Sequence, residues 1–161
     1  RAFWDASGVE LQHVKPHRAL YSMAGKDYGL SRGIAEGIYE VVPDLILMAL
    51  SGSQMIRAAS DIGLRAASEV FADRAYQADG SLVPRGTPGA VIHDVDECIK
   101  RIIGMVKDHQ VIAITGETVQ LSPQSICVHG DTPEAVEFVK NIRENLQKEG
   151  IKLCNLAEGL R

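Results

Sequence analysis

Short apolar runs alternate with stretches of helical periodicity along this chain. The run LILMALS at 45–51 carries no charge, which is typical of a strand that is covered on both faces. Runs of this kind predict strands at 11–17, 45–51, 64–71 and 125–130. Apolar residues three and four apart predict helices at 27–42, 53–63, 95–107 and 132–150. This order predicts an α/β fold of parallel βα units joined by helical crossovers.

Two segments depart from this alternation. Residues 111–122 are expected to form a small hairpin that turns at Thr115-Gly116. Residues 72–92 are rich in Gly, Pro and Asp, and they are expected to form a long loop of the kind that is usually functional or mobile. The last helix is expected to end at Gly150. The apolar residues that this helix is expected to bury are Val136, Val139, Ile142 and Leu146.

Composition indicates one folded domain and excludes several classes of partner. The chain has 161 residues, of which 45% are hydrophobic and 24% charged, so a packed core is expected. A net charge of −4 without a basic run argues against nucleic acid and membrane surfaces as partners. Three cysteines without a Cys-x-x-Cys spacing argue against a disulfide framework and favour a reducing, cytoplasmic location.

Ionisable residues follow the predicted strands at their carboxyl ends. These ends share one edge of a parallel sheet, where binding sites form, so the side chains are expected to converge. They are Lys15 and His17, then Glu69, Asp73 and Arg74, and finally His129 and Asp131. A lysine beside carboxylates and histidines is typical of tuned acid–base groups, which favours an enzyme or a small-ligand binder.

The same residues also have structural interpretations. Lys15 fits a solvated strand end, and Glu69 with Arg74 fits a structural salt bridge. Asp131 and Thr132 fit a helix cap, although the free amides of that helix start can equally hold a phosphate or carboxylate. Two histidines and two or three carboxylates can bind a divalent metal. The sequence has no dedicated spacing such as His-Glu-x-x-His, so no metal ligand is assigned.

Several segments together resemble one family. LQHVKPHRALYSMAGKD, EVFADR and SICVHGD are similar to the LamB/YcsF family, the A subunits of bacterial ATP-dependent 5-oxoprolinase, and the match extends in order over about residues 11–151. The resemblance implies a seven-stranded (β/α) barrel of the glycoside hydrolase/deacetylase type. Residues 1–161 would then be a single domain, an incomplete barrel that lacks its N-terminal third. The resemblance also implies opening of 5-oxo-L-proline to L-glutamate with ATP hydrolysis, together with subunits B and C.

The motifs of the family imply catalytic roles for particular residues. KPH carries over to Lys15 and His17, EVFADR to Glu69, Asp73 and Arg74, and CVHGD to His129 and Asp131. The hypothesis assigns Asp131 or Glu69 as the base and His129 as the acid or proton shuttle. Lys15 and Arg74 are expected to hold negative charge. Arg18 stands where the family usually has glycine, and its effect on the KPH motif is open.

The cofactor and the function leave alternatives. No Walker-type phosphate loop is present, so ATP is expected to be handled by the complex rather than by this chain. One alternative is a metal-dependent hydrolase or deacetylase acting on a carbohydrate-like substrate. Another is a subunit with a non-catalytic binding or scaffold role. An incomplete barrel would leave sheet edges open, which predicts self-association or pairing with the missing segment.

Overall fold

Four parallel strands form the main sheet. The computed structural model describes residues 6–8, 10–130 and 135–160. Its main sheet has the strand order β1–β2–β3–β6, formed by His13–Val14, Ile46–Leu50, Ala66–Phe71 and Ser125–Cys127. β1 pairs in parallel with β2, and β3 pairs in parallel with β6. The predicted α/β fold with parallel strands is therefore confirmed.

The contacts of the chain group it into two compact units. Unit 1 comprises Arg1–Ala49 and Ser53–Ala67, and unit 2 comprises Leu50–Gly52 and Ser68–Arg161. β2 and β3 pass from one unit into the other, and each unit is described by itself below. That both units belong to one incomplete barrel stays a prediction.

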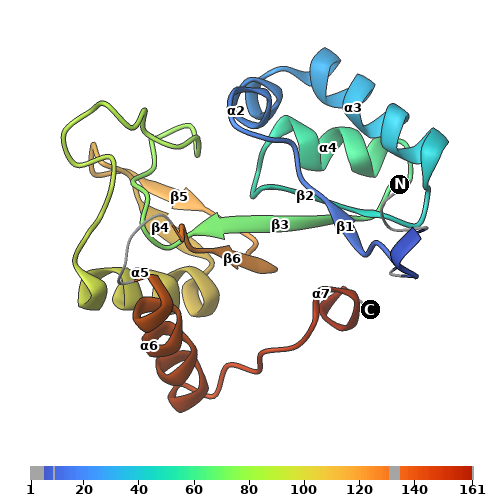
Figure 1. The fold of residues 1–161 in the computed structure, drawn as a ribbon. Helices are drawn as coiled ribbons and strands as arrows, with labels where there is room; N and C mark the ends of the chain where they lie inside the picture. Colours follow the sequence, from blue (N-terminus) through green and yellow to red (C-terminus); the bar gives the residue numbers. More distant parts are fainter. Residues whose placement is uncertain (1–5, 9, 131–134, 161) are drawn as a thin grey trace. The chain divides into compact units, whose positions relative to one another are not determined.

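Unit 1 packs three helices with β1 and most of β2. These helices are α2 (Ala19–Lys26), α3 (Tyr28–Val41) and α4 (Gln54–Asp61), and they lie together in Figure 1. α3 begins where predicted because the Asp27 carboxylate caps it, accepting the Leu30 amide at 2.9 Å. α2 was not predicted from the sequence, and its residues lie between the first predicted strand and the next predicted helix.

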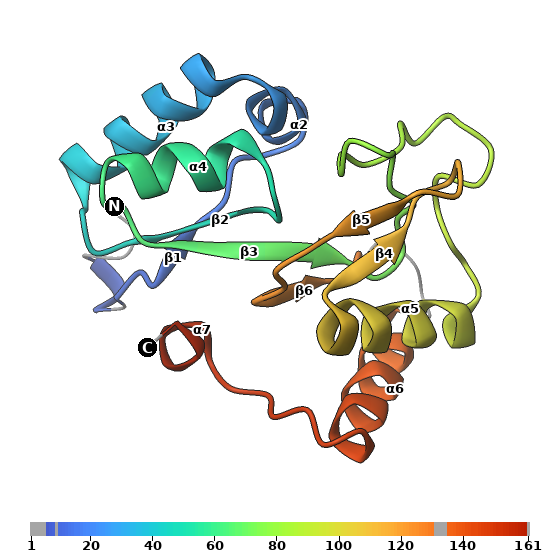
Figure 2. The same ribbon diagram turned by 180° about the vertical axis from the view of Figure 1, so that it is seen from behind.

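Unit 2 contains the remaining regular elements. α5 (Val95–Asp108) and α6 (Ala135–Lys148) lie side by side, as Figure 2 shows, and α7 (Leu156–Gly159) follows α6. β4 (Gln110–Ile112) and β5 (Thr118–Gln120) form a separate antiparallel hairpin, as predicted. None of the helices in the described ranges has the length and apolar content needed to cross a membrane.

α6 buries a different face from the one predicted. Ile142 and Leu146 are buried as expected and pack with Ile102 of α5. Val136 and Val139 are 69% and 49% exposed, so their predicted burial is wrong. Half-buried Phe138 and buried Ala135 extend the packed face instead, and at 3.6 residues per turn Val136 points about 120° away from Ile142.

The predicted stop of α6 at Gly150 is confirmed. Gly150 has φ 76°, a left-handed conformation that glycine adopts without strain from a Cβ atom. The Ile151 amide donates to the Leu146 carbonyl at 2.9 Å, and the Gly150 amide donates to the Gln147 carbonyl at 3.0 Å. These two bonds form a Schellman cap, which turns the chain back so that Ile151 packs on the core cluster.

The segment 72–92 contains no helix or longer strand but has a defined path. Two isolated antiparallel bridges, Arg74 with Val91 and Tyr76 with Leu82, fold the segment back on itself. Three residues of this segment form a small buried cluster, namely Ala75, Val83 and Ala90. This loop begins at the carboxyl end of β3, so Asp73 and Arg74 are its second and third residues.

Candidate functional site

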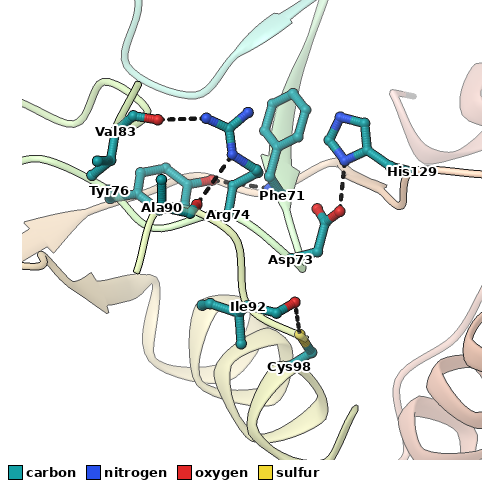
Figure 3. A network of polar contacts seen from close by, with 9 residues as sticks. All are labelled: Phe71, Asp73, Arg74, Tyr76, Val83, Ala90, Ile92, Cys98 and His129. Atoms are coloured by element: carbon teal, nitrogen blue, oxygen red, sulfur yellow. Dashed lines mark hydrogen bonds and ion pairs between the residues drawn. The ribbon is translucent and has the colours of Figure 1, made fainter. Parts of the chain in front are cut away.

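The register of β3 with β6 brings an aspartate and a histidine together. Phe71 of β3 pairs with Cys127 of β6, and two residues further along the two strands lie Asp73 and His129. The Asp73 Oδ2 atom lies 2.6 Å from the His129 Nδ1 atom (Figure 3). Both residues belong to unit 2, so this pair is built within one compact unit.

Burial differs between the two members of the pair. The Asp73 side chain is 12% exposed, whereas the His129 side chain is 25% exposed. The Phe71 ring stacks on the imidazole with ring centroids 5.8 Å apart. Because a carboxylate only accepts, Nδ1 donates its hydrogen to Asp73, and Nε2 is left as the nitrogen that can exchange a proton with a ligand.

The two carboxylate oxygens of Asp73 differ in their hydrogen bonds. The Oδ1 atom is buried and has no hydrogen-bond partner among the described residues. Buried carboxylate oxygens are normally satisfied, since leaving one unpaired costs free energy. Asp131, a predicted site residue, lies outside the described residues, as does the predicted anion site at 132–134.

The backbone around Asp73 is held by several segments. The Ile92 amide donates to the Asp73 carbonyl at 2.9 Å, and the Ala72 amide donates to the Cys127 carbonyl at 3.2 Å. The Tyr76 hydroxyl accepts the Phe71 amide at 2.9 Å. Burial raises the pKa of Tyr76 to about 12, so this phenol stays neutral over the whole physiological range. The backbone that carries the Asp73 side chain is therefore tied by hydrogen bonds to residue 92 and to β6.

Glu69 lies on β3, two residues before Phe71 and four before Asp73. Alternation along a strand places these residues on one face. Glu69 is only 2% exposed, and its backbone carbonyl accepts the Ser51 amide at 2.9 Å. The Ser51 hydroxyl in turn accepts the Ser122 amide at 2.9 Å. A carboxylate so deeply covered is a less accessible proton acceptor than the partly exposed His129.

Arg74 is adjacent to the pair, but its side chain takes another direction. Its guanidinium is buried and donates to the carbonyl oxygens of Ala90, at 3.2 Å, and of Val83. Burial, and secondarily the charge of Arg85, lowers the pKa of Arg74. This guanidinium thus donates to backbone carbonyls, whereas the sequence pattern predicted an anionic ligand or Glu69 as its partner.

Lys15 and His17 belong to unit 1. Lys15 is exposed, with its Nζ 5.3 Å from the centre of the Tyr21 ring, and it borders an apolar hollow of about 590 Å³ between β1 and α3. The His17 Nε2 atom accepts a hydrogen bond from Arg18 Nε at 3.3 Å. Arg18 has φ 51° and ψ −122°, a backbone conformation that a Cβ atom disfavours. The convergence of Lys15 and His17 with Asp73 and His129 stays a prediction.

Three residues that support the site were not predicted. Phe71 shares the face of Asp73 by strand alternation, so period-two spacing was a usable signal for it. Tyr76 and Arg101 act through backbone groups that the sequence does not identify. Among the described residues, no three His, Cys, Asp or Glu side chains form a group that would hold a metal ion.

Comparison with known proteins identifies a family. The model of the LamB/YcsF family matches residues 1–161. The chain is 56% identical over 155 residues to the A subunit of 5-oxoprolinase from Clostridium beijerinckii, covering 96% of this chain and 61% of that protein. It is 52% identical over 160 residues to the protein of the same name from Pyrococcus horikoshii, covering 99% of this chain and 63% of that protein.

A solved structure is also similar. It is the crystal structure of the lactam utilization protein from Thermus thermophilus, with a TM-score of 0.82 and 38% sequence identity. The match covers 94% of this chain and 60% of that one. The chain therefore spans about 60% of the length of the relatives that it matches.

Proposed function

The chain belongs to the LamB/YcsF family, and we propose that it forms part of the A subunit of a 5-oxoprolinase. The reaction proposed is the opening of 5-oxo-L-proline to L-glutamate with ATP hydrolysis. Subunits B and C of the same enzyme are the proposed partners, and the cytoplasm is the proposed location. The names of the relatives support this proposal, and the acid–base pair of unit 2 provides suitable chemistry.

The observation that carries the proposal is the partly exposed His129 held by the covered Asp73. A histidine whose second nitrogen is fixed by a carboxylate is a common general acid–base arrangement. The Phe71 ring restricts the imidazole from one side, so that Nε2 is directed by two contacts. Such a group suits the hydrolysis of a cyclic amide, which requires a proton to be taken from water and given to nitrogen.

The proposed proton transfers use His129 in both directions. Nε2 takes one proton from the attacking water as the water oxygen bonds to the lactam carbonyl carbon. The same proton then passes to the ring nitrogen as the carbon–nitrogen bond breaks, which yields the carboxylic acid and the amine. Asp73 keeps Nδ1 protonated and stabilises the imidazolium between the two steps. This proposal keeps His129 as the acid or shuttle and moves the role of base from Asp131 or Glu69 to His129, with Asp73 as the carboxylate that orients it.

The residues of this site do not fit a nucleotide. Asp73 presents a carboxylate, which repels phosphate, and the Arg74 guanidinium donates to carbonyl oxygens instead of facing the pair. The sequence has no Walker-type phosphate loop. We therefore assign the handling of ATP to the complex and derive no step on this chain through the nucleotide.

The proposal extends to the fold and to the remaining predicted residues. We propose that the parallel βα units form part of a seven-stranded barrel of the glycoside hydrolase/deacetylase type. At the rim of such a barrel, Lys15 and His17 would lie near the Asp73–His129 pair, and Lys15 would hold the carboxylate of the substrate. Glu69 and Asp131 would then adjust the charge around the pair.

The test uses the full-length protein reconstituted with subunits B and C. Release of isotope-labelled glutamate from labelled 5-oxoproline is measured with and without ATP. His129→Ala is expected to lower kcat by at least about 10²-fold. His93→Ala, which removes an exposed histidine from a loop, serves as the matched control and is expected to retain wild-type turnover.

Other results would support the alternatives. Wild-type turnover of His129→Ala would overturn the assignment of the pair. Loss of activity on chelation, with turnover of an acetylated sugar, would favour a metal-dependent deacetylase. Tight binding of the partner subunits together with unchanged turnover in every variant of the site would favour a scaffold role.

A further inference from the structure

The Arg74 side chain joins two distant points of the loop 72–92. Its Nε donates to the Ala90 carbonyl at 3.2 Å and its Nη2 to the Val83 carbonyl (Figure 3). Arg74 is 7% exposed, so these bonds form in a covered environment. The planar guanidinium presents donors in fixed directions, which suits acceptors that approach from two sides.

The same two points are tied by backbone bonds to the residues around the pair. The Ala75 amide donates to the Ala90 carbonyl, and the Val83 amide donates to the Ala75 carbonyl, both at 3.0 Å. Two residues after Ala90, the Ile92 amide donates to the Asp73 carbonyl at 2.9 Å. A shift of the strand-like segment 90–92 would therefore move the backbone of Asp73.

Two residues of α5 contact the backbone at the two ends of the loop. Arg101 Nη2 donates to the carbonyl of Arg74 at 2.9 Å. The Cys98 thiol lies 3.7 Å from the Ile92 carbonyl, in hydrogen-bonding geometry. The backbone of Arg74 is thus held by a helix while its side chain holds the loop.

We infer that Arg74 is a positioning residue that acts on His129 through the loop and Asp73. It holds the Val83 and Ala90 carbonyls in place. The hydrogen bond from the Ile92 amide to the Asp73 carbonyl then links the position of this loop to the position of Asp73, whose carboxylate orients the imidazole. The inference rests on the proposed function only for the reaction that the pair serves. It differs from the expectation that Arg74 holds a negative charge, because the guanidinium donates hydrogen bonds to two loop carbonyls.

The test compares Arg74→Met and Arg74→Lys with Arg85→Met in the full-length protein without substrate. Arg85 is an exposed cation of the same loop, so its variant controls for loss of charge. Both Arg74 variants are expected to speed hydrogen exchange at the Val83 and Ile92 amides by about tenfold or more. Methionine has no donor, and lysine lacks the planar guanidinium that donates to the Val83 and Ala90 carbonyls together. Arg85→Met is expected to leave these rates unchanged.

A second measurement reports on His129 itself. In the protein labelled with ¹⁵N-histidine, the wild type is expected to show the Nδ1–H tautomer of His129, and both Arg74 variants are expected to show a mixture with the Nε2–H form. Faster exchange with an unchanged His129 signal would overturn the positioning role and leave Arg74 as a loop-stabilising residue. Unchanged exchange in both variants would also overturn the inference.

The wild type provides a measurement that does not depend on the folding of a variant. A buried, bonded Arg74 Nε–H is expected to give a guanidinium signal protected from solvent exchange. A signal that exchanges as fast as that of an exposed arginine would contradict the inference. Because none of these three readouts involves turnover, failure of this inference and failure of the proposed activity are distinguishable.

Discussion

Asp73→Asn is the sharpest test of the site, because it removes one charge and almost no volume. The wild-type bond joins Oδ2 to His129 Nδ1 at 2.6 Å, with the carboxylate 12% exposed. A hydrogen bond to a charged group contributes about 1.5–3 kcal/mol and a neutral one about 0.5–1.5 kcal/mol. The expected loss of stability is therefore about 1–1.5 kcal/mol, which lowers Tm by about 2–6 °C in a chain of this size.

The effect on catalysis is expected to be much larger than the effect on stability. The asparagine amide can donate to Nδ1, which favours the Nε2–H tautomer and removes the proton acceptor that faces the ligand. It also cannot stabilise an imidazolium. We expect kcat to fall by about 10²–10⁴-fold, the range typical of general acid–base catalysis.

The assay combines turnover, thermal unfolding and the ¹⁵N signals of His129 in the full-length protein. Asp79→Asn is the matched control, since Asp79 is an exposed carboxylate of the same loop that accepts hydrogen bonds from the amide and the hydroxyl of Ser81. Its kcat and Tm are expected to stay at wild-type values. Wild-type turnover of Asp73→Asn, or a loss of turnover that merely follows a loss of folded protein, would refute the reasoning.

Three further predictions concern buried groups. Tyr76→Phe is expected to cost about 1–3 kcal/mol in urea unfolding, because a buried amide loses its acceptor. In an ultraviolet titration, this variant should also lack the phenol ionisation that is expected near pH 12 in the wild type. Since the folded pKa of about 12 exceeds the unfolded value of 10.0, the stability from this shift is complete below pH 10 and declines from pH 10 to 12. Burial raises the pKa of the Cys98 thiol to about 11. A thiol reagent at pH 8 should therefore modify exposed Cys154 rapidly and Cys98 only on unfolding. Rapid modification of Cys98 in the Cys154→Ser variant would contradict this prediction. Ile142→Ala should destabilise by about 2–5 kcal/mol and Val139→Ala by less than about 0.5 kcal/mol, and equal effects would contradict the observed face of α6.

Local chemistry made much of the fold predictable from the sequence. The parallel βα order follows from the alternation of apolar runs and helical periods, and the hairpin follows from two short strands around Gly116. Asp27 and Gly150 mark helix ends because capping depends on residues within one turn of the cap. The sequence also identified Asp73 and His129 individually, since polar residues at the carboxyl ends of parallel strands share one edge of the sheet.

Tertiary structure alone decided which of these residues interact. His129 pairs with Asp73, 56 residues away, because the register of β3 with β6 aligns them, and no local pattern specifies a register between distant strands. The Arg74 guanidinium donates to two loop carbonyls, and these partners depend on how residues 75–92 fold back, which no local pattern specifies either. On α6, periodicity identified an apolar stripe, but packing against α5 selected Phe138 and left Val136 exposed. Periodicity and capping are local properties of the chain, whereas pairing and burial depend on contacts between segments that are far apart in sequence.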